Sequence, residues 1–240
     1  MRKSNHFKGL VIATALLFAG FGVRAQQLET SVFLNGILPV SQFNNEVNLE
    51  PLGTFEPMTS ENIAKGAAGG LGGSARIGMW FDVGVGQLQP FFEAGFLWNN
   101  SRSYIRNKYD NNERNNVLQQ RPKAPQYFNL PLMLGLKYRY DITPDVRPFV
   151  ELGLGYDLLF ISKNGYPTQT FRYKPSGEFS WMIGAGTYLG EYVSVSLFYM
   201  GLGNHRIDYS SRSYQPEAID YSTVYRRSLG ELGLRVGFHF

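Results

Sequence analysis

The last ten residues of the chain alternate strictly between apolar and polar or small side chains, which is the pattern of a two-faced β-strand. The even positions from 232 to 240 are all apolar, whereas Glu231, Arg235 and His239 share the odd positions with two glycines. Helical side chains repeat about every 3.6 residues, so a helix would not separate these two sets. The chain therefore ends in a strand with one apolar and one polar face.

The same alternation recurs in seven earlier segments, so eight strands are expected in total. The earlier segments are residues 28–38, 71–81, 88–98, 128–140, 150–160, 179–189 and 193–201. The last of these is the weakest, because Phe198 and Met200 share the face of Ser194 and Ser196. No helical period is sustained in the residues between these eight segments.

The connections between these strands alternate in length. Long polar segments cover residues 39–70, 99–126, 162–177 and 202–224, whereas the joints at 82–87, 141–147 and 190–192 are short and carry turn residues. Long loops at one end and tight turns at the other are typical of an up-and-down barrel of outer-membrane type. We therefore predict an all-β fold: an eight-stranded antiparallel up-and-down transmembrane β-barrel with long extracellular loops and short periplasmic turns.

The volume of such a barrel decides which face points inward. The interior of an eight-stranded barrel is just wide enough to be filled by side chains, and the apolar faces carry too many bulky residues to fit there. The opposite faces contain many glycines, which have no side chain and therefore fit in a narrow lumen. The polar faces are therefore predicted to line the lumen and the apolar faces to meet lipid. Several aromatic residues then lie near strand ends, where interfacial girdles occur: Phe81, Trp98, Phe128, Tyr138, Tyr140, Phe160, Phe179 and Phe240.

The first 25 residues resemble a secretory signal peptide. A basic start precedes an apolar run from Gly9 to Val23, and Val23-Arg24-Ala25 forms a small-x-Ala cleavage site. The alternative is an uncleaved membrane anchor, for which the apolar run is short. We expect residues 1–25 to be removed and residues 26–240 to form the barrel domain.

The charge of the chain carries no information about its partners. The excess of basic residues comes from Arg2, Lys3, Lys8 and Arg24 in the signal segment, and without them 19 basic residues face 19 acidic ones. A nucleic-acid-binding role loses its support. The absence of cysteine excludes a disulfide scaffold, a lipid-anchored lipoprotein and a thiol enzyme.

These features together resemble the small eight-stranded outer-membrane barrels, and among them the porin-family or PorT-like outer-membrane β-barrel domain. The resemblance covers the whole chain after the signal segment and implies an outer-membrane location. It also implies that the final strand, with Phe238 and Phe240, carries the signal read by the barrel-assembly machinery. Members of this family include secretion components, adhesins and stabilising barrels, so the resemblance does not specify a function.

Charged residues on the inner faces form the first candidate site. They are Glu29, Arg76, Glu93, Lys137, Arg139, Glu151, Asp157, Glu178, Glu231 and Arg235. Because buried charges must be paired or hydrogen-bonded, we interpret them as an ion-pair network that fills the lumen and sets strand register. The alternative is a path for protons or solutes along the same residues.

The long loops form the second candidate site. Basic and aromatic residues in the second and fourth loops could hold lipopolysaccharide phosphates or a protein partner. The candidates are Arg102, Arg106, Lys108, Arg114, Tyr209, Arg212 and Tyr214. The alternative is that outer-membrane loops have this composition without a specific partner.

Catalysis and metal binding have little support in the sequence. His205 is expected at the start of the fourth loop near Asp208, Ser211 and Ser213, where a hydrolytic grouping is conceivable. It has no companion histidine at metal-binding spacing. We therefore predict a non-catalytic outer-membrane barrel without cofactor or metal, acting in surface interaction or as an accessory of an envelope or secretion assembly. A small pore is the alternative function, and a rim hydrolase using His205 is a weaker one.

Overall fold

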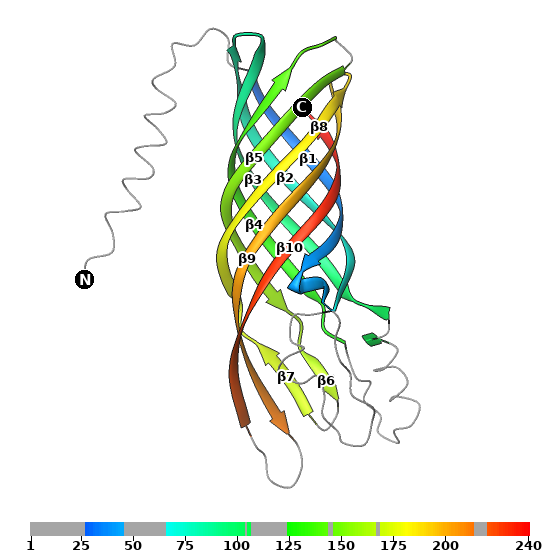
Figure 1. Cartoon of the computed structure of the whole chain (residues 1–240), viewed down its shortest axis with the longest axis vertical. Coiled ribbons are helices and arrows are strands. Elements are labelled where there is room, and N and C mark those ends of the chain that lie inside the picture. Colours follow the sequence, from blue (N-terminus) through cyan, green and yellow to red (C-terminus); the bar gives the residue numbers. More distant parts are fainter. Residues whose placement is uncertain are drawn as a thin grey trace, which may run out of the picture.

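Eight long strands form a closed antiparallel barrel (Figure 1). The computed structural model describes residues 27–45, 66–103, 105–106, 124–143, 146–166, 169–213 and 220–240. The barrel strands are β1 (Gln27–Ser41), β2 (Ala67–Val83), β3 (Gly86–Ser101), β4 (Tyr127–Tyr140), β5 (Val146–Ile161), β8 (Ser176–Leu189), β9 (Val193–Ser213) and β10 (Asp220–His239). Each pairs with its neighbours, and β10 pairs with both β9 and β1, so the eight strands close into a barrel. The predicted fold and strand number are confirmed, whereas the predicted signal segment lies outside the described residues.

The two ends of the barrel differ in the length of their connections. At one end, here named the turn end, Gly84 and Gly190 adopt positive φ angles of 61° and 71° in tight turns. Glycine tolerates this conformation because it lacks a Cβ atom. The C-terminus lies at the same end, where the Phe240 N–H donates to the Thr30 carbonyl oxygen at 2.9 Å. The opposite end, named the loop end, is the one at which β1, β3 and β5 end (Figure 1).

The loop end contains more strand than the sequence predicted. Residues 202–224 were expected to form a loop, but β9 continues to Ser213 and β10 begins at Asp220, and the two remain paired there. A short hairpin, β6 (Asn164–Tyr166) and β7 (Gln169–Tyr173), extends this sheet because β7 pairs with β9. The polar composition of this segment predicts a loop, but a strand beyond the membrane needs apolar residues on one face only. No helix among the described residues has the length and apolar character needed to cross a membrane.

The apolar faces of the strands point outward. On β1, Leu34 is 60% exposed, whereas its neighbour Asn35 is 2% exposed and points inward. The same inversion runs around the barrel, with polar side chains buried and large apolar ones exposed. Such a surface would be unfavourable in water and suits a lipid environment. The predicted assignment of the faces is confirmed.

The interior is less polar than expected. Apolar side chains fill much of the lumen between its middle and the loop end, and they continue into the sheet beyond it: Ile37, Phe91, Leu97, Tyr127, Met133, Leu159, Met182, Phe198, Met200, Leu202, Ile207 and Leu229. The short 3-10 helix η1 (Gln42–Asn44) adds Phe43, which is fully buried and packs edge-on against the Tyr127 ring at 5.1 Å. The lumen is therefore filled by a packed apolar core as well as by charges.

Candidate functional site

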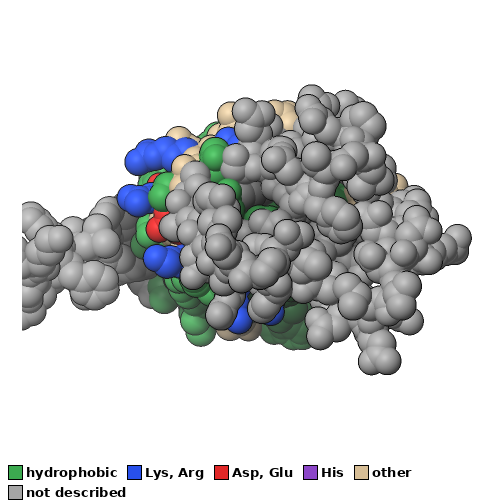
Figure 2. Space-filling view, turned by 90° about the horizontal axis from the view of Figure 1, so that it is seen from below, with side chains coloured by type: hydrophobic (Ala, Val, Ile, Leu, Met, Phe, Trp, Pro, Cys, Tyr) green, Lys and Arg blue, Asp and Glu red, His purple; other side chains and the backbone are tan. Residues whose placement is uncertain are grey.

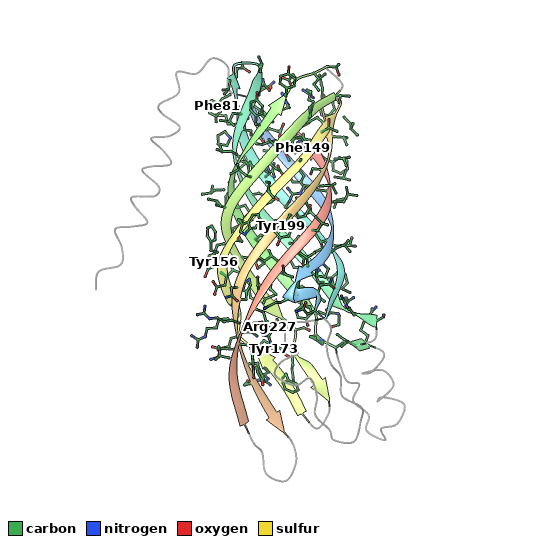
Figure 3. All side chains as sticks on the ribbon, in the orientation of Figure 1. Phe81, Phe149, Tyr156, Tyr173, Tyr199 and Arg227 are labelled. Carbon is green, nitrogen blue, oxygen red and sulfur yellow. The ribbon has the colours of Figure 1, made fainter. Side chains whose placement is uncertain are left out.

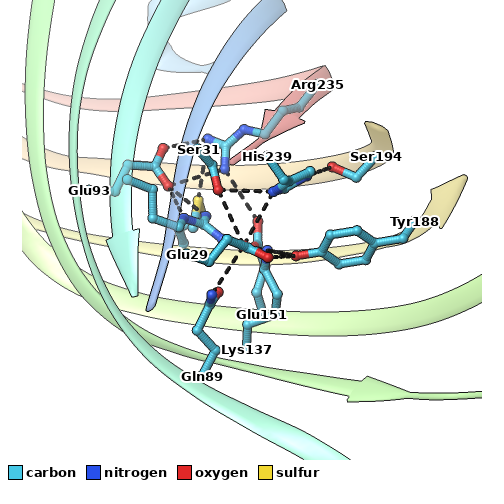
Figure 4. Close-up of polar contacts among 12 residues, drawn as sticks. Glu29, Ser31, Gln89, Glu93, Lys137, Glu151, Tyr188, Ser194, Arg235 and His239 are labelled. Atoms are coloured by element: carbon cyan, nitrogen blue, oxygen red, sulfur yellow. Dashed lines mark hydrogen bonds and ion pairs between the residues drawn. The ribbon is translucent and has the colours of Figure 1, made fainter. Parts of the chain in front are cut away.

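The inward-facing charges fall into three groups at different heights of the lumen rather than into one network. A central group comes from β2, β3, β5 and β10, a second lies towards the turn end, and a third lies towards the loop end. Figure 4 shows the first two groups inside the barrel wall. Because each strand exposes alternate residues to the lumen, the first two groups lie on the polar faces that the alternation predicted. In the third group only Asp157 does, since Ser176 and His205 lie in segments that were predicted to be loops.

The central group is a ring of alternating charges, here named the central ring: Arg76, Glu93, Arg235 and Glu151. Arg76 and Glu93 are directly opposite each other on β2 and β3, and Arg76 Nη2 lies 2.5 Å from Glu93 Oε2. Arg76 Nη1 lies 2.7 Å from Glu151 Oε2. Arg235 Nη2 lies 2.9 Å from Glu93 Oε1, and its Nη1 lies 3.3 Å from Glu151 Oε1. Each arginine thus bridges both glutamates.

Aromatic rings and an amide complete the surroundings of the central ring. The Arg76 guanidinium lies 3.8 Å from the centre of the Phe91 ring, and that of Arg235 lies 4.6 Å from Phe198. Arg235 Nε also donates to Asn35 Oδ1 at 2.9 Å. All four charged side chains are at most 3% exposed. Two positive and two negative groups in a water-poor site compensate one another, and together with the packed rings they close the middle of the lumen.

The group towards the turn end is built around the Glu29 carboxylate. Its Oε2 accepts a hydrogen bond from Trp80 Nε1 at 3.0 Å, and its Oε1 accepts from Gln89 Nε2 and the Tyr188 hydroxyl, both at 3.1 Å. His239 Nδ1 lies 3.2 Å from the same Oε1. One carboxylate therefore holds side chains from four other strands together.

Lys137 joins this group through Tyr188. Its ammonium donates to the Tyr188 hydroxyl at 3.0 Å and lies 4.7 Å from the centre of the Phe149 ring. Arg139 lies nearer the turn, where it pairs with Asp141 at 3.1 Å and bonds to Gln87. These two predicted network members thus contact aromatic and amide groups more than carboxylates.

The loop-end group corrects the predicted position of His205. This residue lies within β9 and is fully buried, instead of opening a loop near Asp208, Ser211 and Ser213. Its Nε2 lies 2.9 Å from the Leu202 carbonyl oxygen and 3.1 Å from Asp157 Oδ2, and its Nδ1 lies 3.2 Å from Ser176 Oγ. Asp157 is therefore held by a histidine rather than by an arginine or lysine.

The two remaining predicted network residues differ from each other. Glu231 is fully buried inside β10 but forms no ion pair with a described residue. Glu178 lies on the inward-facing side of β8, is only partly buried, and likewise pairs with no described cation. Their membership in an ion-pair network stays a prediction.

Sequence reasoning missed several uncharged members of these groups. Trp80, Gln89 and Tyr188 hold Glu29, and Ser194 Oγ lies 2.7 Å from His239 Nε2. All four lie on the inward faces, so the alternation places them in the lumen. Which residues they contact depends on the register between strands. The alternation does not specify this register, so the contacts could not be predicted.

The residues predicted to bind a partner from the loops are not all accessible. Tyr209 is buried rather than available to a partner, and its ring packs against Phe171, Tyr173 and Tyr225 at 6.0–6.3 Å. Arg102 bonds to the Asn44 carbonyl oxygen at 2.7 Å and to the Asn44 side chain, whereas Arg106 is exposed. The side chain of Arg212 and the residues Lys108, Arg114 and Tyr214 lie outside the described part of the structure.

The C-terminal aromatic residues lie on the outer surface of the barrel at the turn end. Phe238 is 41% exposed and Phe240 is 76% exposed. Among the described residues, no group of three or more His, Cys, Asp or Glu side chains is arranged to hold a metal ion.

Comparison with solved structures finds outer-membrane proteins with a similar course of strands. The outer membrane protein OprG from Pseudomonas aeruginosa is 10% identical, with a TM-score of 0.49 over 91% of this chain and 98% of that one. Neisserial surface protein A (NspA) is 11% identical, with a TM-score of 0.40 over 90% of this chain and 100% of that one. A major outer membrane protein from Thermus thermophilus is 12% identical, with a TM-score of 0.44 over 89% of this chain and 100% of that one. At such identities the similarity concerns the fold alone.

No protein-family model matches the sequence, and no curated protein matches it either. The narrower relationship to PorT-like barrels therefore stays a prediction.

Proposed function

We propose that this chain is an integral outer-membrane barrel, exported by a cleaved signal peptide, that acts without catalysis through contacts at its loop end. The observation that carries the proposal is a contrast between the two parts of the molecule. The middle of the lumen is filled by the buried central ring, whereas β9 and β10 continue past the lipid-facing band as a paired sheet. A closed interior with a projecting, ordered sheet favours recognition over transport.

The proposed partners follow from this arrangement. An envelope or secretion protein would contact the loop end, where the protein would be an accessory of that assembly. Outer-membrane lipids, including lipopolysaccharide, would surround the apolar exterior. The barrel-assembly machinery would engage the final strand, in which Phe238 and Phe240 point away from the lumen. Nucleic acid has no place in this proposal.

The test is affinity purification of the tagged protein from gently solubilised outer membranes, with companions identified by mass spectrometry. A variant should lack residues 210–222, with an Asn-Gly turn joining Tyr209 to Thr223, which are directly opposite each other. This truncation shortens the projecting sheet but retains His205 and all of the barrel below it. We expect a stoichiometric companion of the unmodified protein to be lost from the truncated one.

The matched control places the same Asn-Gly turn at the opposite end, in the variant Gly84→Asn with Val85→Gly. This turn joins β2 to β3, which stay paired from Val83 and Gly86 onwards. The control should retain the companion, because its loop end is unchanged. Equal retention by the truncated variant and the control, or purification of the unmodified barrel alone, would contradict the proposed role.

A hydrolase is the second candidate, and one contact set favours it. Because the Leu202 carbonyl and the Asp157 carboxylate can only accept hydrogen bonds, a neutral His205 carries its proton on Nε2. Its Nδ1 is then free to accept the proton of Ser176, as a general base accepts the proton of a nucleophile. Against catalysis, His205 and Asp157 are fully buried and Ser176 is 7% exposed, which leaves little access for a substrate.

Hydrolysis of short-chain and phospholipid esters by the purified protein tests this candidate. We expect no turnover, and the same background from Ser176→Ala, because these contacts would serve to hold three strands together. Turnover that disappears in Ser176→Ala while the barrel remains folded would establish the hydrolase and overturn the non-catalytic proposal.

A further inference from the structure

The outward face of the sheet at the loop end carries two arginines directly opposite each other. Arg206 on β9 and Arg226 on β10 are cross-strand partners, and both are exposed. Like charges directly opposite each other on neighbouring strands destabilise a sheet. Such a pair is therefore costly unless an anion lies between its members.

The neighbouring strand adds two further cations to the same face. Arg172 on β7 is opposite Ser210, and the Lys174 N–H donates to the Asp208 carbonyl oxygen at 2.9 Å. Both side chains are exposed. We name the four residues Arg172, Lys174, Arg206 and Arg226 the cationic face. Seen from the loop end, several Lys and Arg side chains lie along the left edge of the molecule, with acidic atoms between them (Figure 2).

The described acidic side chains neutralise the cationic face only in part. Among the described outward side chains of β7, β9 and β10 beyond the bulge at Leu229/Gly230, Asp208 is the single acidic one. It lies 3.6 Å from Arg206 Nε, and the Arg206 side chain is still 60% exposed. The inward side of the same strands is occupied by the packed rings of Tyr173, Tyr209 and Tyr225. The aromatic packing gives the four cations a rigid support, with Tyr173 and Arg227 marking this level in Figure 3.

The depth of the cationic face matches that of lipid headgroups. Phe179, which is 59% exposed on the exterior, lies near the loop-end edge of the apolar band, and Gly203 lies against its backbone. Arg206 follows three residues after Gly203, or about 10 Å further along the strand. With a strand tilt of about 40°, this is about 8 Å along the membrane normal, and the headgroup region on each side of a bilayer is about 5–8 Å thick.

We propose that the cationic face binds the phosphate groups of outer-leaflet lipids. The planar guanidinium of arginine forms paired hydrogen bonds with phosphate oxygens, and a phosphate between Arg206 and Arg226 would relieve their repulsion. The proposal rests on the proposed function in one respect, because it requires the loop end to be the outer surface. It adds a specific ligand class and four specific residues to that function.

The experiment measures binding of diphosphoryl lipid A to the full-length barrel in neutral detergent by native mass spectrometry. The test variant is Arg206→Gln with Arg226→Gln. Loss of a charge-assisted bond should weaken lipid A binding about tenfold or more. The unmodified protein should also bind dephosphorylated lipid A about tenfold more weakly than the diphosphoryl form. Raised salt should weaken binding to the unmodified protein steeply, which tests the proposal even if the variant does not fold.

The control is Lys163→Gln. It removes a charge from an exposed residue of the loop end that lies outside the β7–β9–β10 sheet, and it should bind lipid A within about twofold of the unmodified protein. Heat-dependent gel mobility verifies that each variant is folded.

Three results would overturn the proposal: unchanged binding by the arginine variant, equal binding of dephosphorylated lipid A, or displacement of lipid A by equimolar inorganic phosphate. The third would identify a site for soluble anions instead. None of them depends on the companion protein, so this proposal and the proposed function can fail separately.

Discussion

At the scale of single residues, the central ring shows how two arginines and two glutamates can be buried in a narrow lumen. Every charge has two opposite charges within 3.3 Å. Such an arrangement adds little stability compared with an apolar core of equal volume, but removing one member leaves an uncompensated buried charge. The ring therefore makes the barrel sensitive to single substitutions at its centre.

Replacement of Arg235 by leucine should destabilise the barrel by about 3–5 kcal/mol, because Glu93 and Glu151 would then share Arg76 alone. Urea unfolding of the protein in lipid vesicles, followed by tryptophan fluorescence, measures this loss. The control Arg106→Leu changes an exposed residue and should alter stability by at most about 0.5 kcal/mol. Equal stability of the two variants would mean that the ring is not electrostatically coupled.

At the scale of strands, glycines on the inner face make room for large neighbours. Gly233 on β10 lies against the Phe198 ring, where an added Cβ atom would overlap ring carbons. Gly36 is in the next residue pair of the same ladder, since Ile37 is opposite Gly233 and Gly36 is opposite Leu234. It points outward and has nothing within 4 Å of an added Cβ atom.

Substitution Gly233→Ala should therefore lower the free energy of unfolding by about 1–3 kcal/mol, the usual cost of overpacking. Gly36→Ala, at the same height of the barrel, should be neutral or slightly stabilising, because alanine restricts the unfolded chain. The same urea experiment compares the two. A larger loss for Gly36→Ala would mean that the faces of this strand are assigned the wrong way round.

At the scale of the whole molecule, the apolar exterior implies that the cost of a surface charge depends on depth. Leu234 is opposite Gly36, which lies between the outward-facing Leu34 and Leu38 of β1, and it is 52% exposed. Leu28 is 60% exposed and lies near the turn end. Leu234→Arg should destabilise the barrel by about 2–4 kcal/mol in vesicles, and Leu28→Arg by about 0–1 kcal/mol. Similar exposure makes the pair a control for everything except depth. Equal effects would argue against a membrane-embedded exterior.

Because the lumen is filled, we expect the barrel not to conduct ions. A conductance measurement therefore tests the alternative that the protein is a pore. The unmodified barrel should show no sustained ionic conductance in planar bilayers, because the central ring and its aromatic neighbours occupy the cross-section. Stable open channels in the unmodified protein would contradict this expectation. If Arg235→Leu, with Arg106→Leu as the control, opened transient channels, the ring would be the barrier.

Two residues were placed wrongly from the sequence, because their positions depend on the whole molecule. His205 and Tyr209 were expected in an accessible loop because their surroundings in the sequence are polar. The structure places both on the inward face of β9, where His205 contacts Asp157 and Ser176, and Tyr209 packs against rings from β7 and β10. Polarity of a segment indicates contact with water on at least one face, and it does not exclude a strand.

The sequence by itself determined the fold class, the number of barrel strands and which face of each strand meets the lumen. The physical reason is local: alternation has the period of a strand whatever its neighbours are, and the volume of the apolar side chains allows one assignment of the faces. Only the tertiary structure decided which inward side chains meet. Glu29 and Tyr188 are separated by 159 residues, and their contact depends on the relative shift of strands around the closed barrel. That shift is a property of the whole sheet and leaves no local pattern in the chain.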